Sequence, residues 1–146
     1  MNRTFTCHET IPCTPHDLWQ FIIDFNNMPM WLKDVNKIQQ ISPNQFEVFI
    51  QSETGGQSFV SVFQLKEVIE EKSFTISSVI AGFLIEYKYQ IIDSFEQCKV
   101  TLEVVCEGKN SLWKSLAPLM SWLLRPSDKR ILTNLREAII LHLAEA

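Results

Sequence analysis

Side chains that could do chemistry are few in this sequence, and they are scattered. The four cysteines contain no C-x-x-C pair, and the three histidines lack the i, i+4 or knuckle spacing of metal ligands. These residues are Cys7, Cys13, Cys98, Cys106, His8, His16 and His142. We therefore expect no metal site and no cofactor. Because the chain is long enough to bury a core without disulfides, we also expect reduced thiols.

Two residues are candidates for catalysis, Glu9 and Cys106. Glu9 shares strand parity with apolar residues, so it could face a cavity and transfer protons; the alternative, which we favour, is a strand-end carboxylate that reaches solvent or bonds to backbone. Cys106 could be a nucleophile beside Tyr87 or Tyr89, but a nucleophilic thiol needs a base or a local positive charge, and the sequence places no histidine nearby. We predict no catalytic residue.

Composition and charge limit the classes of protein. The chain has 146 residues and 17.0 kDa, 46% of them hydrophobic and 21% charged, which predicts one globular domain spanning residues 1–146. A net charge of −4 without a basic block argues against nucleic acid as a partner. The longest uncharged stretch, Ser73–Ile85, has 13 residues, fewer than the roughly 20 needed to span a bilayer. The N-terminus lacks a secretory signal, so we expect a cytoplasmic protein.

The N-terminal region predicts a strand followed by two short helical segments. Apolar and polar residues alternate over Arg3–Ile11, as in a half-buried strand. Thr14 is placed as an N-cap and Pro15 as the first helical residue. The helix should end near Asn26-Asn27, and a second short turn should carry Met30 and Trp31.

The middle of the chain predicts an antiparallel sheet, because short alternating runs are separated by turn signals. The expected strands are Asp34–Ile41, Gln45–Ser52, Gln57–Lys66, Lys72–Ile80, Phe83–Asp93 and Cys98–Glu107. Successive side chains point to opposite faces, and one parity is almost entirely apolar. It comprises Phe46, Val48, Ile50, Phe59, Ser61, Phe63, Leu65, Phe74, Ile76, Ser78, Ile80, Phe83, Ile85, Tyr87, Tyr89, Ile91, Val100, Leu102, Val104 and Cys106. The other parity, which includes Thr75, Glu86 and Lys88, should face water.

The C-terminal region predicts the helical cover of the apolar face. Ser111–Leu124 carries one apolar stripe, made of Leu112, Leu116, Leu119, Met120 and Leu123. Pro126 should kink or break the helix before a second segment. The expected buried side of that segment is Ile131, Leu132, Leu135, Ala138, Ile139 and Leu143. Helical-wheel geometry leaves Trp122, Ile140 and Leu141 off the stripes, where a contiguous patch would serve a homodimer, another protein or transient membrane contact.

Two segments, Ile11–Trp19 and Phe25–Trp31, carry a resemblance to a known family. They read Ile-Pro-Cys-Thr-Pro-His-Asp-Leu-Trp and Phe-Asn-Asn-Met-Pro-Met-Trp. Together with the element order, they resemble the polyketide cyclase/dehydrase-like branch of the START-related (SRPBCC, helix-grip) superfamily, over nearly the whole chain. The resemblance implies an α+β fold in which a curved, seven-stranded antiparallel sheet wraps around a long C-terminal helix, here Pro-kinked, with two short helices after the first strand. It also implies an apolar cavity for lipids, sterols, polyketides or other hydrophobic molecules.

Three functions are consistent with these features. The first hypothesis is non-covalent binding or transport of a hydrophobic small molecule between sheet and helix. The alternatives are a cyclase- or dehydratase-like enzyme and a protein-interaction module. Some members of the proposed site have a competing role in core packing: we favour packing for Tyr87 and Tyr89, whereas Trp31 is equally suited to packing and to lining a cavity. The predicted ligand-binding residues are Trp31, Phe59, Ser61, Phe63, Ser78, Tyr87, Tyr89, Leu102, Cys106, Leu116 and Met120.

Overall fold

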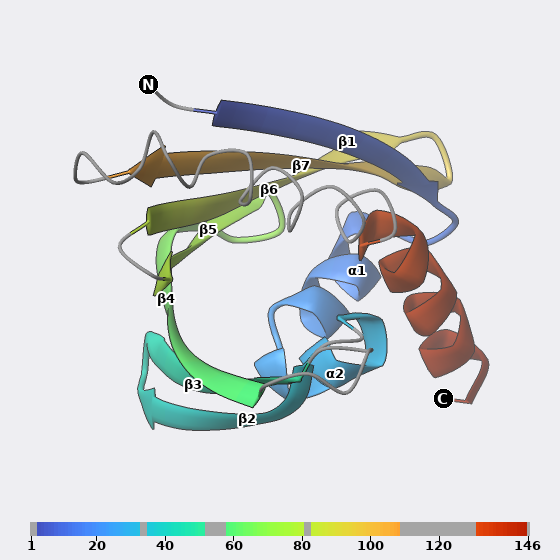
Figure 1. The fold of residues 1–146 in the computed structure, drawn as a ribbon. Helices are drawn as coiled ribbons and strands as arrows, with labels where there is room; N and C mark the ends of the chain where they lie inside the picture. The colour runs from blue at the N-terminus through green and yellow to red at the C-terminus, as the bar shows by residue number, and fades with distance from the viewer. Residues whose placement is uncertain (1–2, 33–34, 52–57, 81–82, 109–130, 146) are drawn as a thin grey trace.

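A computed structural model describes residues 3–32, 35–51, 58–80, 83–108 and 131–145. In it, one antiparallel sheet of seven strands has the order β1-β7-β6-β5-β4-β3-β2. The sheet curls around helices that lie on its concave side (Figure 1). The strands are β1 (Arg3–Ile11), β2 (Val35–Ser42), β3 (Gln45–Gln51), β4 (Ser58–Ile69), β5 (Ser73–Ile80), β6 (Phe83–Ser94) and β7 (Gln97–Gly108). The predicted architecture is confirmed.

The strand β4 extends beyond its predicted end at Lys66. The pairing of β4 with β5 shifts register between Lys66 and Ile69, which is a bulge. Glu67 within it has a φ of 55°, a left-handed conformation uncommon for residues other than glycine. The run of charged residues after Lys66 reads as a turn, but the bulge lets the strand continue to Ile69.

The N-terminal helices begin where the capping residues predict. The Thr14 hydroxyl accepts a hydrogen bond from the Asp17 backbone N–H at 3.1 Å, and α1 (Pro15–Ile22) follows. The helix ends earlier than predicted, because the Asp24 side chain caps a separate 3₁₀ turn, η1 (Phe25–Asn27). The short helix α2 (Met28–Trp31) then carries Met30 and Trp31, as expected.

The C-terminal helix covers residues 131–145 within the described part of the chain and lies beside α1 (Figure 1). Its buried residues are Ile131, Leu132, Leu135, Ala138 and Ile139. Ile140 and Leu141 are exposed, as predicted. The prediction for Leu143 is wrong: it is 37% exposed, because the last turn of the helix points away from the sheet (Figure 1). Trp122, the stripe of Ser111–Leu124 and the expected kink at Pro126 lie outside the described residues.

The concave face holds the hydrophobic core. Val48, Phe74, Ile76 and Val100 are each at most 2% exposed. On the convex face, the expectation that Thr75 faces water is wrong, since it is 4% exposed. The side chains of the neighbouring strands cover it: Thr75 donates a hydrogen bond to Glu67 Oε2 at 3.1 Å, and a Lys66–Glu86 ion pair joins β4 to β6 across β5. None of the described helices is long and apolar enough to cross a membrane.

Candidate ligand-binding site

The concave face of β3 to β6 is an apolar wall that contains one buried pair of hydroxyls. Ser61 on β4 and Ser78 on β5 are 5% and 2% exposed, and their Oγ atoms lie 2.5 Å apart in a hydrogen bond. Strand pairing places Val48 beside Ser61, and it places Phe63 and Ile85 on either side of Ser78. The hydroxyl pair is therefore a small polar spot enclosed by hydrocarbon.

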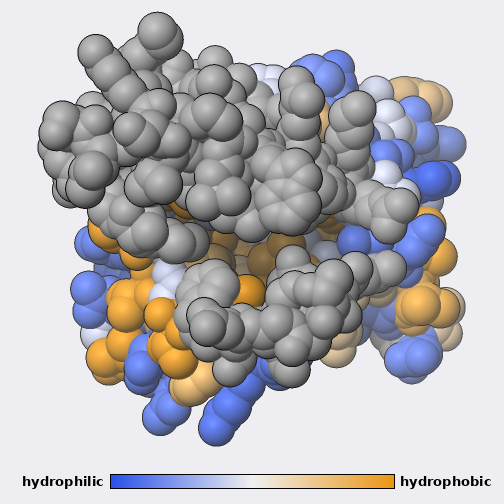
Figure 2. All heavy atoms as spheres, in the orientation of Figure 1, coloured by the Kyte–Doolittle hydropathy of each residue, from blue (hydrophilic) through white to orange (hydrophobic). Residues whose placement is uncertain are grey.

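Tyr87 extends this wall along β6. It is partly buried, and its ring centroid lies 6.4 Å from that of Phe63. Figure 2 shows hydrophobic side chains recessed below the surface on the face viewed there. The structure thus brings together four of the predicted site residues, Ser61, Phe63, Ser78 and Tyr87.

Three other predicted site residues lie in the packed core. The Trp31 ring meets the Tyr89 ring edge-on, with centroids 6.0 Å apart, and Tyr89 stacks on Phe74 at 4.8 Å. Leu102 is fully buried. Trp31 is 1% exposed and its Nε1 has no hydrogen-bond partner among the described residues, which is unusual for a buried indole N–H. Ligand contact by these three residues stays a prediction.

Four of the predicted site residues cannot be placed. The side chains of Phe59 and Cys106 lie outside the described part of the structure, although their backbones pair with Ile50 and Ile85. Leu116 and Met120 lie in the segment 109–130, which is also outside it. The nucleophile hypothesis for Cys106 is therefore untested.

Glu9 lies at the edge of the concave side, on β1, opposite Val100 of β7. Its Oε2 accepts a hydrogen bond from the Thr133 hydroxyl of the C-terminal helix at 3.3 Å. This contact ties the carboxylate to the helix rather than to backbone. No charged residue occupies the concave-facing positions of β3 to β7 in the following ranges. They are 46–50, 61–65, 74–78, 85–91 and 98–104.

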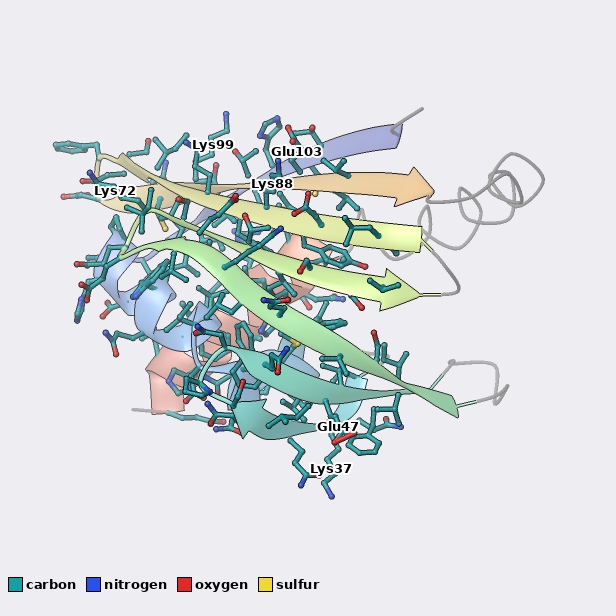
Figure 3. The ribbon with its side chains drawn as sticks, turned by 90° about the vertical axis from the view of Figure 1, so that its left-hand side faces the viewer. Lys37, Glu47, Lys72, Lys88, Lys99 and Glu103 are labelled. Atoms are coloured by element: carbon teal, nitrogen blue, oxygen red, sulfur yellow. The ribbon has the colours of Figure 1, made fainter. Side chains whose placement is uncertain are left out.

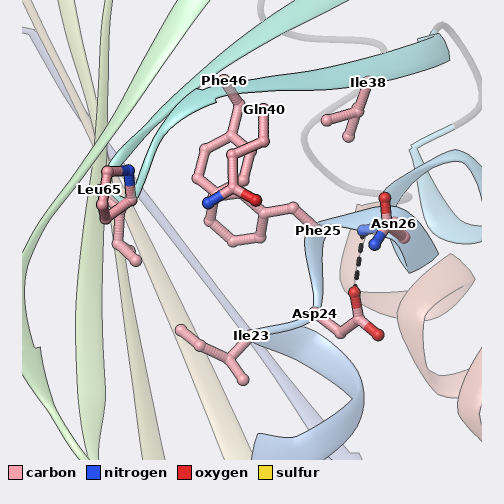
Figure 4. Close-up of a pocket in the computed structure, with 9 residues that line it drawn as sticks. Ile23, Asp24, Phe25, Asn26, Ile38, Gln40, Phe46 and Leu65 are labelled. Carbon is pink, nitrogen blue, oxygen red and sulfur yellow. Dashed lines mark hydrogen bonds between the residues drawn. The ribbon is translucent and has the colours of Figure 1, made fainter.

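A pocket of about 260 Å³, which the sequence analysis did not find, opens at the α1 end of the same face. Its walls come from the end of α1, from η1 and from β2, β3 and β4 (Figure 4). The Phe25 and Phe46 rings pack at a centroid distance of 4.4 Å, and Leu65 lies opposite Ile23. Asp24 lies at the rim, where one carboxylate oxygen caps η1. The early end of α1 creates this opening, and the Asp24–Asn26 capping pattern is the signal that could have revealed it.

The charged side chains gather on the opposite side. Lys37, Glu47, Lys72, Lys88, Lys99 and Glu103 lie on or beside the convex side of the sheet, away from the helices (Figure 3). Lys66 also lies on this face, where the hydrogen bond to Glu86 raises its pKa. This arrangement separates a charged exterior from the uncharged concave wall.

Two buried thiols form a second polar contact, away from the hydroxyl pair. Cys13, after the end of β1, and Cys98, at the start of β7, have Sγ atoms 4.0 Å apart, and both are free cysteines. The hydrogen bond between the two thiols, in which either sulfur can be the donor, raises the pKa of Cys13 and lowers that of Cys98, and burial raises the Cys13 pKa further. Among the described residues, no three His, Cys, Asp or Glu side chains gather as metal ligands would.

Comparison with solved structures identifies the architecture. The protein TTHA0849 from Thermus thermophilus superposes with a TM-score of 0.77 at 15% identity, over 96% of this chain and 99% of that one. A START superfamily protein from Mycobacterium smegmatis gives 0.67 at 14% identity, over 97% of each chain. This chain has the START-like helix-grip fold.

A further structural neighbour of this helix-grip protein comes from the steffimycin biosynthetic pathway. The di-domain ARO/CYC protein StfQ of the steffimycin pathway matches with a TM-score of 0.73 at 9% identity, over 99% of this chain and 52% of that one. The fold predicted by the resemblance is confirmed. No protein-family model and no curated protein sequence matches the chain. At these identities the comparisons establish the fold, and the function has to be argued from the site.

Proposed function

We propose that this helix-grip protein binds a hydrophobic small molecule on the concave face of its sheet and carries or sequesters it without covalent chemistry. The observation that supports the proposal is the uncharged concave wall, whose polar atoms are hydroxyls. Hydrophobic ligand sites have this character, with a mostly apolar lining and a few placed polar groups. The predicted site residues that line the wall, Ser61, Phe63, Ser78 and Tyr87, would form the centre of the site.

The pocket beside η1 adjoins one end of this wall, and its lining also includes the polar side chains of Asp24, Asn26 and Gln40. Phe46 and Leu65 line the pocket and share the concave face with Ser61 and Phe63. Leu65 is four residues from Ser61, which corresponds to about 13 Å along the strand. An elongated ligand that follows β4 from the hydroxyl pair to this opening would meet both apolar and polar side chains there.

Catalysis has less support from the wall. A general acid or base must lie within hydrogen-bond reach of the reacting atom. Glu9 lies on the edge strand and is hydrogen-bonded to Thr133, whereas the hydroxyl pair lies on β4 and β5. In the sheet order β4 is the fourth strand after β1, and neighbouring strands are about 4.8 Å apart. Glu9 and the hydroxyl pair would therefore not both reach one small substrate atom.

A dye-binding experiment tests the proposal. The solvatochromic ketone Prodan should gain fluorescence and shift to the blue when the protein is added, with a dissociation constant of tens of micromolar or tighter. Replacing Tyr87 with Trp should weaken binding at least threefold, because the larger ring occupies space above the wall. The matched control is Lys88→Trp, which adds the same ring to the next residue on the convex face and should leave binding unchanged.

Either of two results would contradict the proposal. One is the absence of saturable binding by the folded wild-type protein at tens of micromolar. The other is an equal loss of binding in the Tyr87 and Lys88 variants, which would locate the dye outside the concave face.

A further inference from the structure

We propose that the Ser61–Ser78 pair acts as one hydrogen-bonding unit that receives a neutral oxygen, a ketone, ester or hydroxyl group, of an otherwise apolar ligand. This inference rests on the proposed function and names its ligand class. It assigns the pair a purpose beyond packing, since each hydroxyl brings the cost of burying a polar group into an apolar wall.

The pair has hydrogen-bonding capacity to spare. Each hydroxyl offers one hydrogen and two acceptor positions. The bond between the two Oγ atoms uses one hydrogen and one acceptor position, and either serine can be the donor. The second hydroxyl hydrogen is not used in this bond, and among the described residues no other hydrogen bond of the two side chains is seen. One donor and several acceptor positions are therefore left for a ligand.

The two hydroxyls also strengthen each other. A hydroxyl that accepts a hydrogen bond becomes a better donor, and this polarisation is greatest in surroundings of low dielectric constant. Ser61 and Ser78 are 5% and 2% exposed, and apolar residues flank them along the sheet. A ligand oxygen that accepts from the pair would thus form a stronger bond than it would with a single serine.

The described part of the wall offers no cation to an anionic ligand at this position. A buried carboxylate needs a cationic or multiply hydrogen-bonding partner, because its desolvation is costly. Of the described lysine and arginine side chains, Lys37, Lys72, Lys88 and Lys99 lie on or beside the convex side (Figure 3), Lys66 is paired with Glu86, and Arg136 is exposed on the C-terminal helix. The hydroxyl pair can satisfy a neutral oxygen but cannot neutralise a carboxylate.

Three naphthalenes of nearly equal size test the ligand class in competition with Prodan. They are 2-acetylnaphthalene, which carries a ketone, 2-ethylnaphthalene, which lacks the oxygen, and 2-naphthoate, which is an anion. We expect the ketone to bind about fivefold more tightly than the hydrocarbon, within the roughly 2- to 12-fold effect of one net hydrogen bond. The anion should bind at least tenfold more weakly than the ketone.

Matched variants then assign the effect to the pair. The double substitution Ser61→Ala and Ser78→Ala should remove the preference for the ketone and leave the affinity for 2-ethylnaphthalene within twofold of wild type. The control is Ser77→Ala, which removes a buried hydroxyl from the opposite face of the same strand and should preserve the preference.

The carbonyl stretch of bound 2-acetylnaphthalene provides a second readout that needs no variant. In the wild-type complex it should lie at lower frequency than in hexane, as hydrogen bonding requires. A hexane-like frequency, equal affinity for ketone and hydrocarbon, or tighter binding of the anion would overturn the role of the pair while leaving the proposed function intact. If none of the three compounds nor Prodan binds, the proposed function itself fails.

Discussion

The buried thiol pair predicts a loss of stability at alkaline pH. In the folded protein the hydrogen bond between the Cys13 and Cys98 thiols and the burial of Cys13 hold the pKa of Cys13 far above its ordinary value of 9.0. Well above pH 9 the unfolded chain has released both thiol protons, whereas the folded pair keeps one proton between its two sulfurs. Because the folded state then binds more protons, rising pH favours unfolding.

The size of the effect follows from the number of protons. One proton retained by the folded state corresponds to about 1.4 kcal/mol per pH unit above the unfolded pKa. The lowered pKa of Cys98 acts in the opposite direction, but only below the unfolded pKa, where the unfolded chain still holds a proton that folded Cys98 has released. Between pH 10 and pH 11 that contribution has ended, so the pair should lower the free energy of unfolding by about 1.4 kcal/mol.

Urea unfolding at pH 10, 10.5 and 11 measures the loss, with a reductant present to keep the thiols free. The double variant Cys13→Ala and Cys98→Ala should lose less stability over this range by about 1.4 kcal/mol, because it lacks both thiols. Both alanines are needed, since either cysteine alone would still be buried. Cys7→Ala, which leaves the pair intact, should behave as wild type. The reasoning is refuted if wild type and the double variant show the same dependence on pH.

Three further perturbations have defined outcomes. Thr14→Ala should lower the free energy of unfolding by about 1 kcal/mol, because the N-terminus of α1 loses the side-chain acceptor for Asp17 N–H; urea titration against Thr10→Ala as a control measures it. Leu135→Ala should cost about 2–5 kcal/mol, since Leu135 is fully buried, and a smaller loss by the same titration would contradict tight docking of the helix. Glu9→Gln and Cys106→Ala should each leave Prodan affinity within twofold; a loss beyond tenfold in a folded variant would assign that side chain to the site.

The strand boundaries were predictable because local patterns specify them. Alternating polarity and turn residues placed the strands close to their observed bounds, and Thr14 with Pro15 located the start of α1. The exception is β4, which continues through a bulge at Glu67. A bulge depends on the pairing partner as well as on local sequence, so the charged run after Lys66 indicated a turn instead.

Burial of single residues was less predictable where it depends on neighbouring elements. Thr75 has the parity of a solvent-facing residue, yet side chains from the adjacent strands β4 and β6 cover it. Leu143 has the spacing of a buried residue, yet it is exposed in the last turn of the C-terminal helix, where the neighbouring His142 packs on Phe21 of α1. Parity and helical phase specify a direction, and only the tertiary arrangement determines what occupies that direction.

The sequence by itself determined which residues share a face within each strand: parity groups Ser61 with Phe63 on β4 and groups Tyr87 with the apolar residues of β6. The tertiary structure decided the contacts between residues far apart in the chain. It brought Ser61 within hydrogen-bond distance of Ser78 and Cys13 within 4.0 Å of Cys98. The register of β4 against β5, and the turn that ends β1 against the start of β7, set these two pairs. Register depends on long-range packing and hairpin geometry, so a residue's own neighbours in sequence do not specify it.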